Sequence, residues 1–145
     1  MKRLWLCLPL VAACSKDTNQ VVNSGFSSDT GPYVDEDAPV ITHVPIETSQ
    51  SFQQPVTIEA TVVDDYAGVD KVEVSYKRED KATWTVIPLN LQDQASGKYS
   101  SQIPGPEVIS GGMDYYLHAT DKAGNEVFLP TEGESNPYHF RIDGG

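Results

Sequence analysis

Two thiols are the most reactive groups in this 145-residue chain, and both lie near its start. Cys7 and Cys14 are the only cysteines, so a disulfide, a thiolate metal site or a cysteine modification would involve them. Their surroundings are those of an export signal. Lys2 and Arg3 are basic, residues 4–11 are mostly apolar, and two alanines follow. A segment of this kind directs export and is not part of the fold.

Val11, Ala12 and Ala13 directly precede Cys14, and this pattern resembles the lipobox of bacterial lipoprotein signals. The resemblance implies a signal peptide over residues 1–13 and cleavage before the cysteine. It also implies a diacylglyceryl thioether on the Cys14 thiol and a fatty acid such as palmitate on the freed amine. Two or three acyl chains anchor a protein durably, whereas one binds only marginally. The alternative is an ordinary secreted protein whose Cys14 stands there by chance.

The two cysteines then have different fates. Leu6 is too bulky for the small-residue position before Cys7, so that cysteine fails the pattern and leaves with the signal. The mature chain keeps one alkylated thiol, and we expect no intrachain disulfide and no thiolate metal site. Cleavage removes Lys2 and Arg3 but no acidic residue, which takes the formal charge from −11 to −13.

The remaining bases and nucleophiles show no catalytic pattern. His43, His118 and His139 fall on three different expected strands, and no two have metal-ligand spacing. His118 alternates with apolar residues, so we expect it to face outward. The chain has no Gly-x-Ser-x-Gly elbow and no glycine-rich phosphate loop. We therefore expect a protein that is not an enzyme. A hydrolase, as an alternative, would need a cleft that gathers a base and a nucleophile.

Trp84 and Tyr76 are the residues that could hold a sugar, because aromatic platforms bind carbohydrate in β-sandwich modules. The alternative is a structural role in the core, since Trp84 and Val86 alternate within one expected strand. We favour the core for Trp84. A buried ring would favour protein partners, and an exposed ring beside other aromatics would favour sugar.

The composition is that of a folded protein with an acidic surface. The chain is 39% hydrophobic and 9% aromatic, with a formal charge of −11 and a pI near 4.4. Such a surface repels the phosphate backbone, which excludes nucleic acid as a main partner. No apolar run reaches the roughly 20 residues of a membrane-spanning helix. The length allows one domain with some residues to spare.

Residues 14–37 are expected to be the lipidated cysteine and a flexible tether. The stretch is rich in Ser, Asp, Asn, Thr and Gly and has no apolar period. Some 23 such residues reach roughly 25–30 Å. In the sorting pattern of many Gram-negative lipoproteins, an Asp after the cysteine retains the protein at the inner membrane. Ser15 therefore favours the outer membrane, and it leaves open whether the protein faces the periplasm or the surface.

From Ala38 onward the chain consists of short alternating runs separated by turn residues. Period-2 alternation with one apolar face is typical of half-buried antiparallel strands. About seven strands in some 105 residues predict a single all-β antiparallel β-sandwich over residues 38–143. The expected strands are 39–46, 55–64, 70–77, 81–89, 98–103, 113–121 and 137–142.

The segment DYYLHATDKAGN (114–125) resembles strand F and the following turn of bacterial immunoglobulin-like and fibronectin type III-like domains. With DEDAPVI and VVDDYAGVDKVEVSY, the resemblance covers about residues 36–143. It implies a sandwich of that type and a structural Tyr115, buried with its hydroxyl bonded to main chain upstream. The chain departs from antibody domains in lacking their Cys pair and Trp. Residues 131–137 interrupt the last strand, which leaves the order of the edge strands open.

In a sandwich of this topology, three acidic loops lie at one pole. Oxygen ligands that converge from several loops are what Ca²⁺ requires. The alternative is that the aspartates cap turns through Asx hydrogen bonds, with Gly68 and Gly124 supplying positive φ. The candidate calcium ligands are Asp37, Asp64, Asp65, Asp121 and Asn125, beside Asp35 and Glu36.

The sequence thus predicts a membrane-anchored envelope lipoprotein that presents a non-catalytic β-sandwich to another envelope or surface protein. The role would be interaction, structure or adhesion, through loops or an edge strand that accepts a partner strand. The alternative is a carbohydrate- or polymer-binding module of the cell envelope. The partner and the oligomeric state are left open. Because the tether joins the first strand, the acidic pole is expected to face the membrane.

Overall fold

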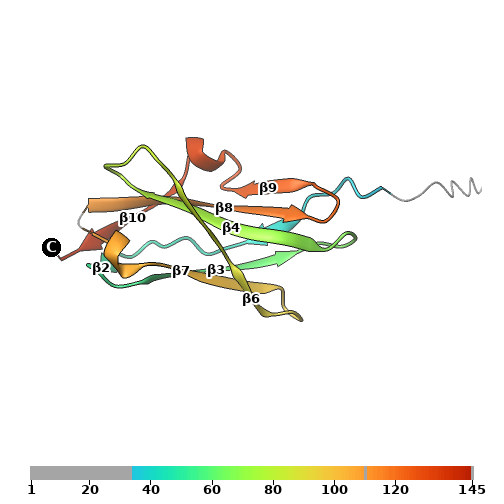
Figure 1. Cartoon of the computed structure of the whole chain (residues 1–145), viewed down its shortest axis with the longest axis horizontal. Helices are drawn as coiled ribbons and strands as arrows, with labels where there is room; N and C mark the ends of the chain where they lie inside the picture. The colour runs from blue at the N-terminus through green and yellow to red at the C-terminus, as the bar shows by residue number, and fades with distance from the viewer. Residues whose placement is uncertain (1–33, 110, 145) are drawn as a thin grey trace, which may run out of the picture. The chain divides into compact units, whose positions relative to one another are not determined.

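The computed structural model describes residues 34–109 and 111–144, and these residues form two β-sheets with a shared core. Figure 1 shows the layers edge-on, with β4, β8, β9 and β10 in one and β3, β6 and β7 in the other. The expected all-β, sandwich-like architecture is confirmed.

The four-stranded sheet is antiparallel throughout. Its strands, in spatial order, are β1 (Val40–Thr42), β3 (Val56–Val63), β7 (Lys98–Ile103) and β6 (Asn90–Asp93). β1 pairs with residues 61–63 of β3 and then leaves it. Within the described residues, the remainder of β3 therefore has no strand neighbour on that side.

The six-stranded sheet contains the two longest strands, which pair with each other at its centre. Its order is β2 (Gln50–Ser51), β10 (Tyr138–Asp143), β8 (Gly111–Asp121), β4 (Val69–Arg78) and β5 (Thr85–Pro88), with β9 (Glu126–Leu129) also on β8. β2 is parallel to β10, and the other pairs are antiparallel.

β9 and β10 follow each other along one side of β8. β9 pairs with residues 117–120 of β8, and β10 pairs with residues 111–115. The segment 130–137 that separates them carries the short 3-10 helix η2 (Gly133–Ser135). A second 3-10 helix, η1 (Gly105–Glu107), precedes β8.

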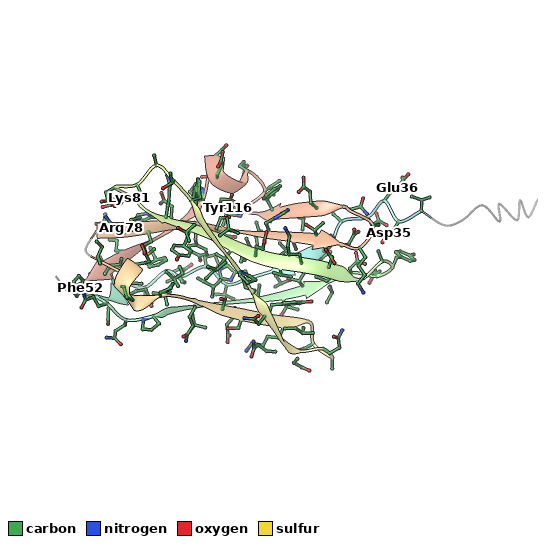
Figure 2. All side chains as sticks on the ribbon, viewed as in Figure 1. Asp35, Glu36, Phe52, Arg78, Lys81 and Tyr116 are labelled. Atoms are coloured by element: carbon green, nitrogen blue, oxygen red, sulfur yellow. The ribbon has the colours of Figure 1, made fainter. Side chains whose placement is uncertain are left out.

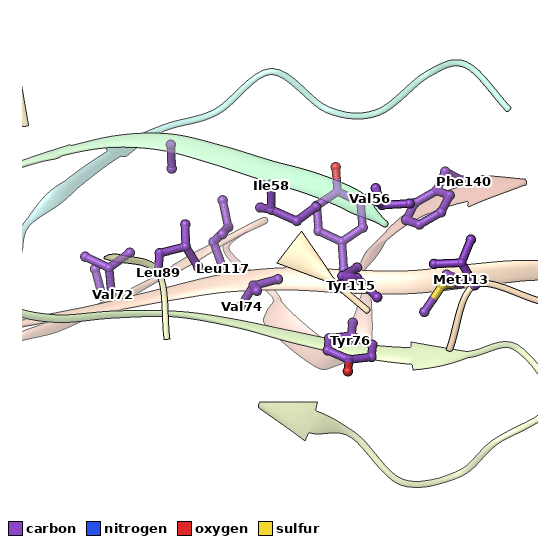
Figure 3. Packing of buried hydrophobic residues seen from close by; sticks show 14 of the residues in the cluster. Val56, Ile58, Val72, Val74, Tyr76, Leu89, Met113, Tyr115, Leu117 and Phe140 are labelled. Carbon is purple, nitrogen blue, oxygen red and sulfur yellow. The ribbon is translucent and has the colours of Figure 1, made fainter. Parts of the chain in front are cut away.

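The core lies between the sheets because every second side chain of the long strands is apolar. In β3 these are Val56, Ile58, Ala60 and Val62, and each is buried. Burial of a large apolar side chain contributes about 1.5–3 kcal/mol, so this alternation fixes which face turns inward. Figure 3 shows the β4 and β8 members of the core packed beneath β3. The remaining core residues are Val72, Val74, Tyr76, Leu89, Ile103, Val108, Met113, Tyr115, Leu117, Ala119, Phe140 and Ile142.

Each of the seven expected runs contains a strand, and three further strands were not expected. β2, β6 and β9 have two to four residues each, which is too short for alternation to show. The described fold also includes residues 34–37, upstream of the predicted boundary at Ala38. The predicted signal peptide, the lipobox (Val11, Ala12, Ala13), Cys14 and most of the tether lie outside the described residues.

Among the described residues, no helix has the length and apolar character needed to cross a membrane.

Candidate functional site

The outer face of the six-stranded sheet, which is turned away from the core, carries large polar and aromatic side chains. On β8, Tyr116 and His118 alternate with the buried Tyr115 and Leu117. On β9, Phe128 lies opposite His118 in the strand register. All three outward side chains are partly buried against their neighbours on the sheet. The expectation that His118 faces outward agrees with this placement.

Trp84 lies on this outer face and not in the core. It directly precedes β5, where Thr85 pairs with Tyr76, and it is not part of the buried hydrophobic cluster. Val86, which shares its alternation, is 53% exposed. The prediction that Trp84 packs in the core is therefore wrong. Tyr76, its expected partner in a sugar platform, is 3% exposed and belongs to the core instead.

Three aromatic rings and an imidazole form a continuous row on this face. Trp84 and Tyr116 meet edge to face, with centroids 4.9 Å apart and planes at 73°. Tyr116 and Phe128 follow at 6.1 Å, and His118 stacks on Phe128 at 4.5 Å. We call these four residues the aromatic strip. Figure 2 labels Tyr116 within the six-stranded layer.

Sequence reasoning missed Tyr116 and Phe128 as members of a site. A signal for Tyr116 was present, because it alternates with the core residue Tyr115 in the run 113–121. Phe128 lies in β9, a strand that the sequence did not reveal.

Two groups border the strip. The Lys77 ammonium lies 4.9 Å from the centroid of the Trp84 ring, a cation–π arrangement. At the other end, Gly133 of η2 lies against Phe128, since a Cβ at that glycine would be 3.5 Å from the ring. The Lys77 side chain and the backbone of η2 therefore both pack against rings of the strip.

Most charged groups of the outer face are paired with one another. Asp114 accepts from His139 Nδ1 at 2.9 Å and lies 3.8 Å from the Lys77 ammonium. The other pairs join Lys71 to Glu73 at 3.1 Å, His118 to Glu73 at 3.6 Å, and His118 to Glu126 at 3.0 Å. The strip is thus bordered by fixed donors and acceptors.

At one end of the sandwich, three carboxylates come together as the loop arrangement predicts. One oxygen each of Asp35, Asp64 and Asp121 lies within 4.8 Å of the others. The predicted set differs in its members, because Asp35 takes the place of Asp37 and Asp65. Asp37 contributes its carbonyl, which accepts from the Asn125 amide at 3.2 Å.

The carboxylates of this acidic pole already accept main-chain hydrogen bonds. Asp64 Oδ1 accepts from Gly68 N at 2.5 Å, and Asp121 Oδ1 accepts from Gly124 N at 2.6 Å. Burial would raise the pKa of Asp121, but hydrogen bonds from Asn125, Gly124 and Ala123 outweigh it and lower the pKa. These are the bonds of capped turns, with positive φ at both glycines.

Calcium at the pole stays a prediction from the sequence. A rise in melting temperature with millimolar Ca²⁺, abolished by Asp121→Ala, would support it. A melting curve that Ca²⁺ leaves unchanged would contradict it.

The buried Tyr115 joins the two sheets through its hydroxyl. Figure 3 shows its ring reaching from β8 across the core towards β3. The hydroxyl accepts from Ile46 N at 3.0 Å and lies 2.9 Å from His43 Nε2. Ile46 lies 69 residues upstream, in the crossing between β1 and β2, so the hydroxyl is bonded to main chain upstream, as the resemblance implies. Burial raises the pKa of Tyr115 to about 12.

A cleft of about 630 Å³ lies where β1 leaves β3. It is lined by the segment 42–46 and by outward residues of β3, with Lys98 at its margin. His43 Nδ1 binds the Glu59 carbonyl across it at 2.6 Å. The cleft is thus bordered by the part of β3 that has no strand neighbour.

No protein-family model and no curated protein sequence matches this chain. Its fold is similar to part of a solved structure, the endo-β-1,4-mannanase from Thermotoga petrophila, with a TM-score of 0.51 and 14% sequence identity. The similarity covers 77% of this chain and 21% of the mannanase, so this chain spans about a fifth of its length. At this identity the comparison shows a shared fold and nothing about activity.

Proposed function

We propose that this chain is a non-catalytic carbohydrate- or polymer-binding module of the cell envelope, held at a membrane by a lipidated N-terminus. The observation that carries the proposal is Trp84, which lies outside the core beside Tyr116 and Phe128. The negative face of an aromatic ring attracts the C–H groups of a sugar ring, and paired charges beside it bind hydroxyls. Trp84 is partly buried, but it lies outside the core beside other aromatic rings, and this placement supports the sugar-binding alternative.

The similarity to a mannanase supports the same proposal. A domain of this fold forms about a fifth of an enzyme that is named for a polysaccharide substrate. A binding module of the same fold is therefore compatible with glycans as ligands. The specificity for mannan is not carried over, because a likeness at 14% identity extends to the fold alone.

The test is the retardation of the full-length chain in native gels that contain soluble polysaccharides. We expect at least one polysaccharide to retard the wild type and Tyr66→Ala, which removes an exposed aromatic ring elsewhere. Trp84→Ala should migrate freely. Phe128→Leu, which keeps apolar contact with η2, should be less retarded than the wild type. Urea midpoints close to that of the wild type would show that the variants are folded. Equal retardation of wild type and Trp84→Ala would contradict the proposal.

The finer fold assignment belongs to the same proposal: the sandwich is immunoglobulin-like. The order β1-β3-β7-β6 corresponds to strands A, B, E and D of that fold. In the second sheet, β10, β8 and β4 correspond to strands G, F and C. The division of the first strand between the two sheets supports this reading.

The anchor is proposed on the lipobox pattern alone. Cys14 would carry the lipid, and Ser15 favours the outer membrane. Metabolic labelling with a palmitate analogue should mark the wild type and not Cys14→Ala. Label retained on Cys14→Ala would remove the anchor from the proposal and leave glycan binding untouched.

A protein partner is the second candidate, and the cleft at β3 favours it. Main-chain groups alternate along a strand, and Val62 N donates to Gly97 O on the β7 side. Thr57 therefore turns its N–H to the open edge, where a partner strand could pair. In a pull-down from detergent-solubilised envelope, Thr57→Pro should lose such a partner and Trp84→Ala should keep it. A partner retained by Thr57→Pro would contradict this second candidate.

A further inference from the structure

The charge of the outer face differs from that of the whole chain. The chain carries −11, yet the outward residues of β4, β8, β9 and β10 nearly cancel. Their positions follow from alternation with core residues in the same strands. The face has three cations, Lys71, Lys77 and Arg141, and four carboxylates, Glu73, Asp114, Glu126 and Asp143. The strands that carry the aromatic strip thus present a nearly neutral face on an acidic protein, with Glu132 and Glu134 of the η2 segment at its margin.

The carboxylates nearest the strip are also held in place. Asp114 is bound between Lys77 and His139, and Glu73 lies beside both Lys71 and His118. A carboxylate paired in this way keeps free lone pairs that accept hydrogen bonds from hydroxyl groups. Because the cation beside it offsets its charge, such a carboxylate has little long-range electrostatic effect on a charged ligand.

We infer that the ligand of the aromatic strip is an uncharged polysaccharide and that polyanions are excluded from the strip. The inference rests on the proposed function and narrows it to one ligand class. Rings that stack on sugar C–H groups and paired carboxylates that accept from hydroxyls fit a neutral polyol. A polyanion would gain no net cation on this face and would be repelled by the rest of the surface.

The test uses fluorescence of Trp84. The chain has two tryptophans, and Trp5 lies in the predicted signal peptide. Trp5→Phe in the full-length chain therefore leaves Trp84 as the only tryptophan, whether or not the signal is cleaved. The probes are two neutral polysaccharides, glucomannan and xyloglucan, and two anionic ones, alginate and polygalacturonate. Each is titrated at low and at high salt. Tyr116→Ala is the strip variant and Tyr66→Ala the aromatic control.

We expect a saturable change in Trp84 emission with a neutral polysaccharide, and less than about a twofold change in Kd with salt, because no ion pairs form. Tyr116→Ala should weaken binding about tenfold, and Tyr66→Ala should not change it. Saturable binding of alginate or polygalacturonate that Tyr116→Ala abolishes would overturn the inference and leave the proposed function standing. If all four fail to bind and only anionic polysaccharides retard the chain in the gels, this inference is overturned and the proposed function stands. If all four fail to bind and no polysaccharide retards the chain, both are overturned.

Discussion

The hydroxyl of Tyr115 shows how much a single polar atom can hold in a small core. It accepts from the Ile46 N–H and, in the neutral network, donates to His43 Nε2. His43 then donates from Nδ1 to the Glu59 carbonyl. One hydroxyl thus fixes the crossing segment between the sheets, while the ring itself packs beside Tyr138 and Phe140.

Tyr115→Phe should lower the free energy of unfolding by about 1–3 kcal/mol. The ring still fills its site, but the variant leaves the Ile46 N–H and His43 Nε2 without their shared partner. Urea unfolding at neutral pH measures the loss as a lower midpoint at constant slope. Tyr99→Phe is the control, because no hydrogen bond of the Tyr99 hydroxyl is found among the described residues. Equal losses in both variants would contradict the role of the Tyr115 hydroxyl.

His43 should make the stability fall on acidification. Burial lowers the pKa of His43 below 6.5, although the bond to the Glu59 carbonyl works in the other direction. The unfolded chain therefore binds more protons between the folded pKa and about 6.5, and stability decreases as pH falls through that window. Below the folded pKa this contribution is constant.

The measurement is urea unfolding of the wild type and His43→Gln from about pH 7.5 to about pH 5. The wild type should lose more stability than the variant across this range. Other titrating groups are common to both proteins, so they cancel in the difference. Parallel curves would show that His43 does not titrate as its burial requires.

At the scale of elements, turns differ in how much room they leave. Gly97, at the turn into β7, has φ +64, and a Cβ there would lie 2.5 Å from the Val62 carbonyl. Gly124, at the turn between β8 and β9, has φ +97 and nothing within 4 Å of a Cβ. Both turns need a residue with positive φ, but only the turn at Gly97 also lacks the space for a Cβ atom.

Gly124→Ala should cost about 1–2 kcal/mol of unfolding free energy, the penalty of a left-handed alanine. Gly97→Ala should cost more, because β3 must also move away from the new methyl group, and this movement would stretch the bond from Val62 N to the Gly97 carbonyl. Urea midpoints of the two variants measure the difference. A smaller loss in Gly97→Ala than in Gly124→Ala would contradict this account.

The elements also show what alternation in a sequence can predict. It identified the buried faces of β3, β4, β8 and β10, because each run has most of its apolar residues in one phase. The run 81–89 has them in both phases, with Trp84 and Val86 in one and Ile87 and Leu89 in the other. The alternation alone cannot say which of the two sets turns inward. In the structure Leu89 is buried and Val86 is exposed.

The sequence predicted where the acidic pole lies in the fold, but it did not predict which carboxylates come together there. Strand topology brings the three loops together, and a topology can be argued from the order of strands. Which carboxylate points inward depends on loop conformation, and the Ala67 N–H draws in Asp35. Trp84 and Phe128 both contact Tyr116 only because β4, which carries β5, pairs with β8, a strand far away in the sequence.

At the scale of the whole fold, the two ends of the sandwich differ. Figure 2 shows Asp35 and Phe52 at opposite ends, and the eight residues of β3 between them span about 25 Å. The acidic pole lies at the end where the described chain begins. On an anchored protein, this end should be the nearer one to the membrane.

Energy transfer from a thiol-linked donor to acceptor-labelled lipids tests this orientation. In the proposed lipoprotein, Cys14 is acylated and Cys7 is removed, so an introduced cysteine is the only thiol. Asp65→Cys, at the acidic pole, should transfer more efficiently than Gln54→Cys at the other end. Greater transfer from Gln54→Cys would reverse the orientation, and the melting temperatures of both variants control for folding.

The crossing of the chain from β1 in one sheet to β2 in the other has a mechanical consequence. A pull on the N-terminus enters through Asp35 and Asp37, whose carbonyls accept from the Asn125 amide, and then loads β1 along its length against β3. Hydrogen bonds of an antiparallel pair stressed along the strands share the force and do not open one by one. The chain next crosses to β2, so tension is passed to β10 and the sheet that carries the aromatic strip. If a ligand bound to the aromatic strip pulls against the anchored N-terminus, the hydrogen bonds of both sheets therefore resist the force.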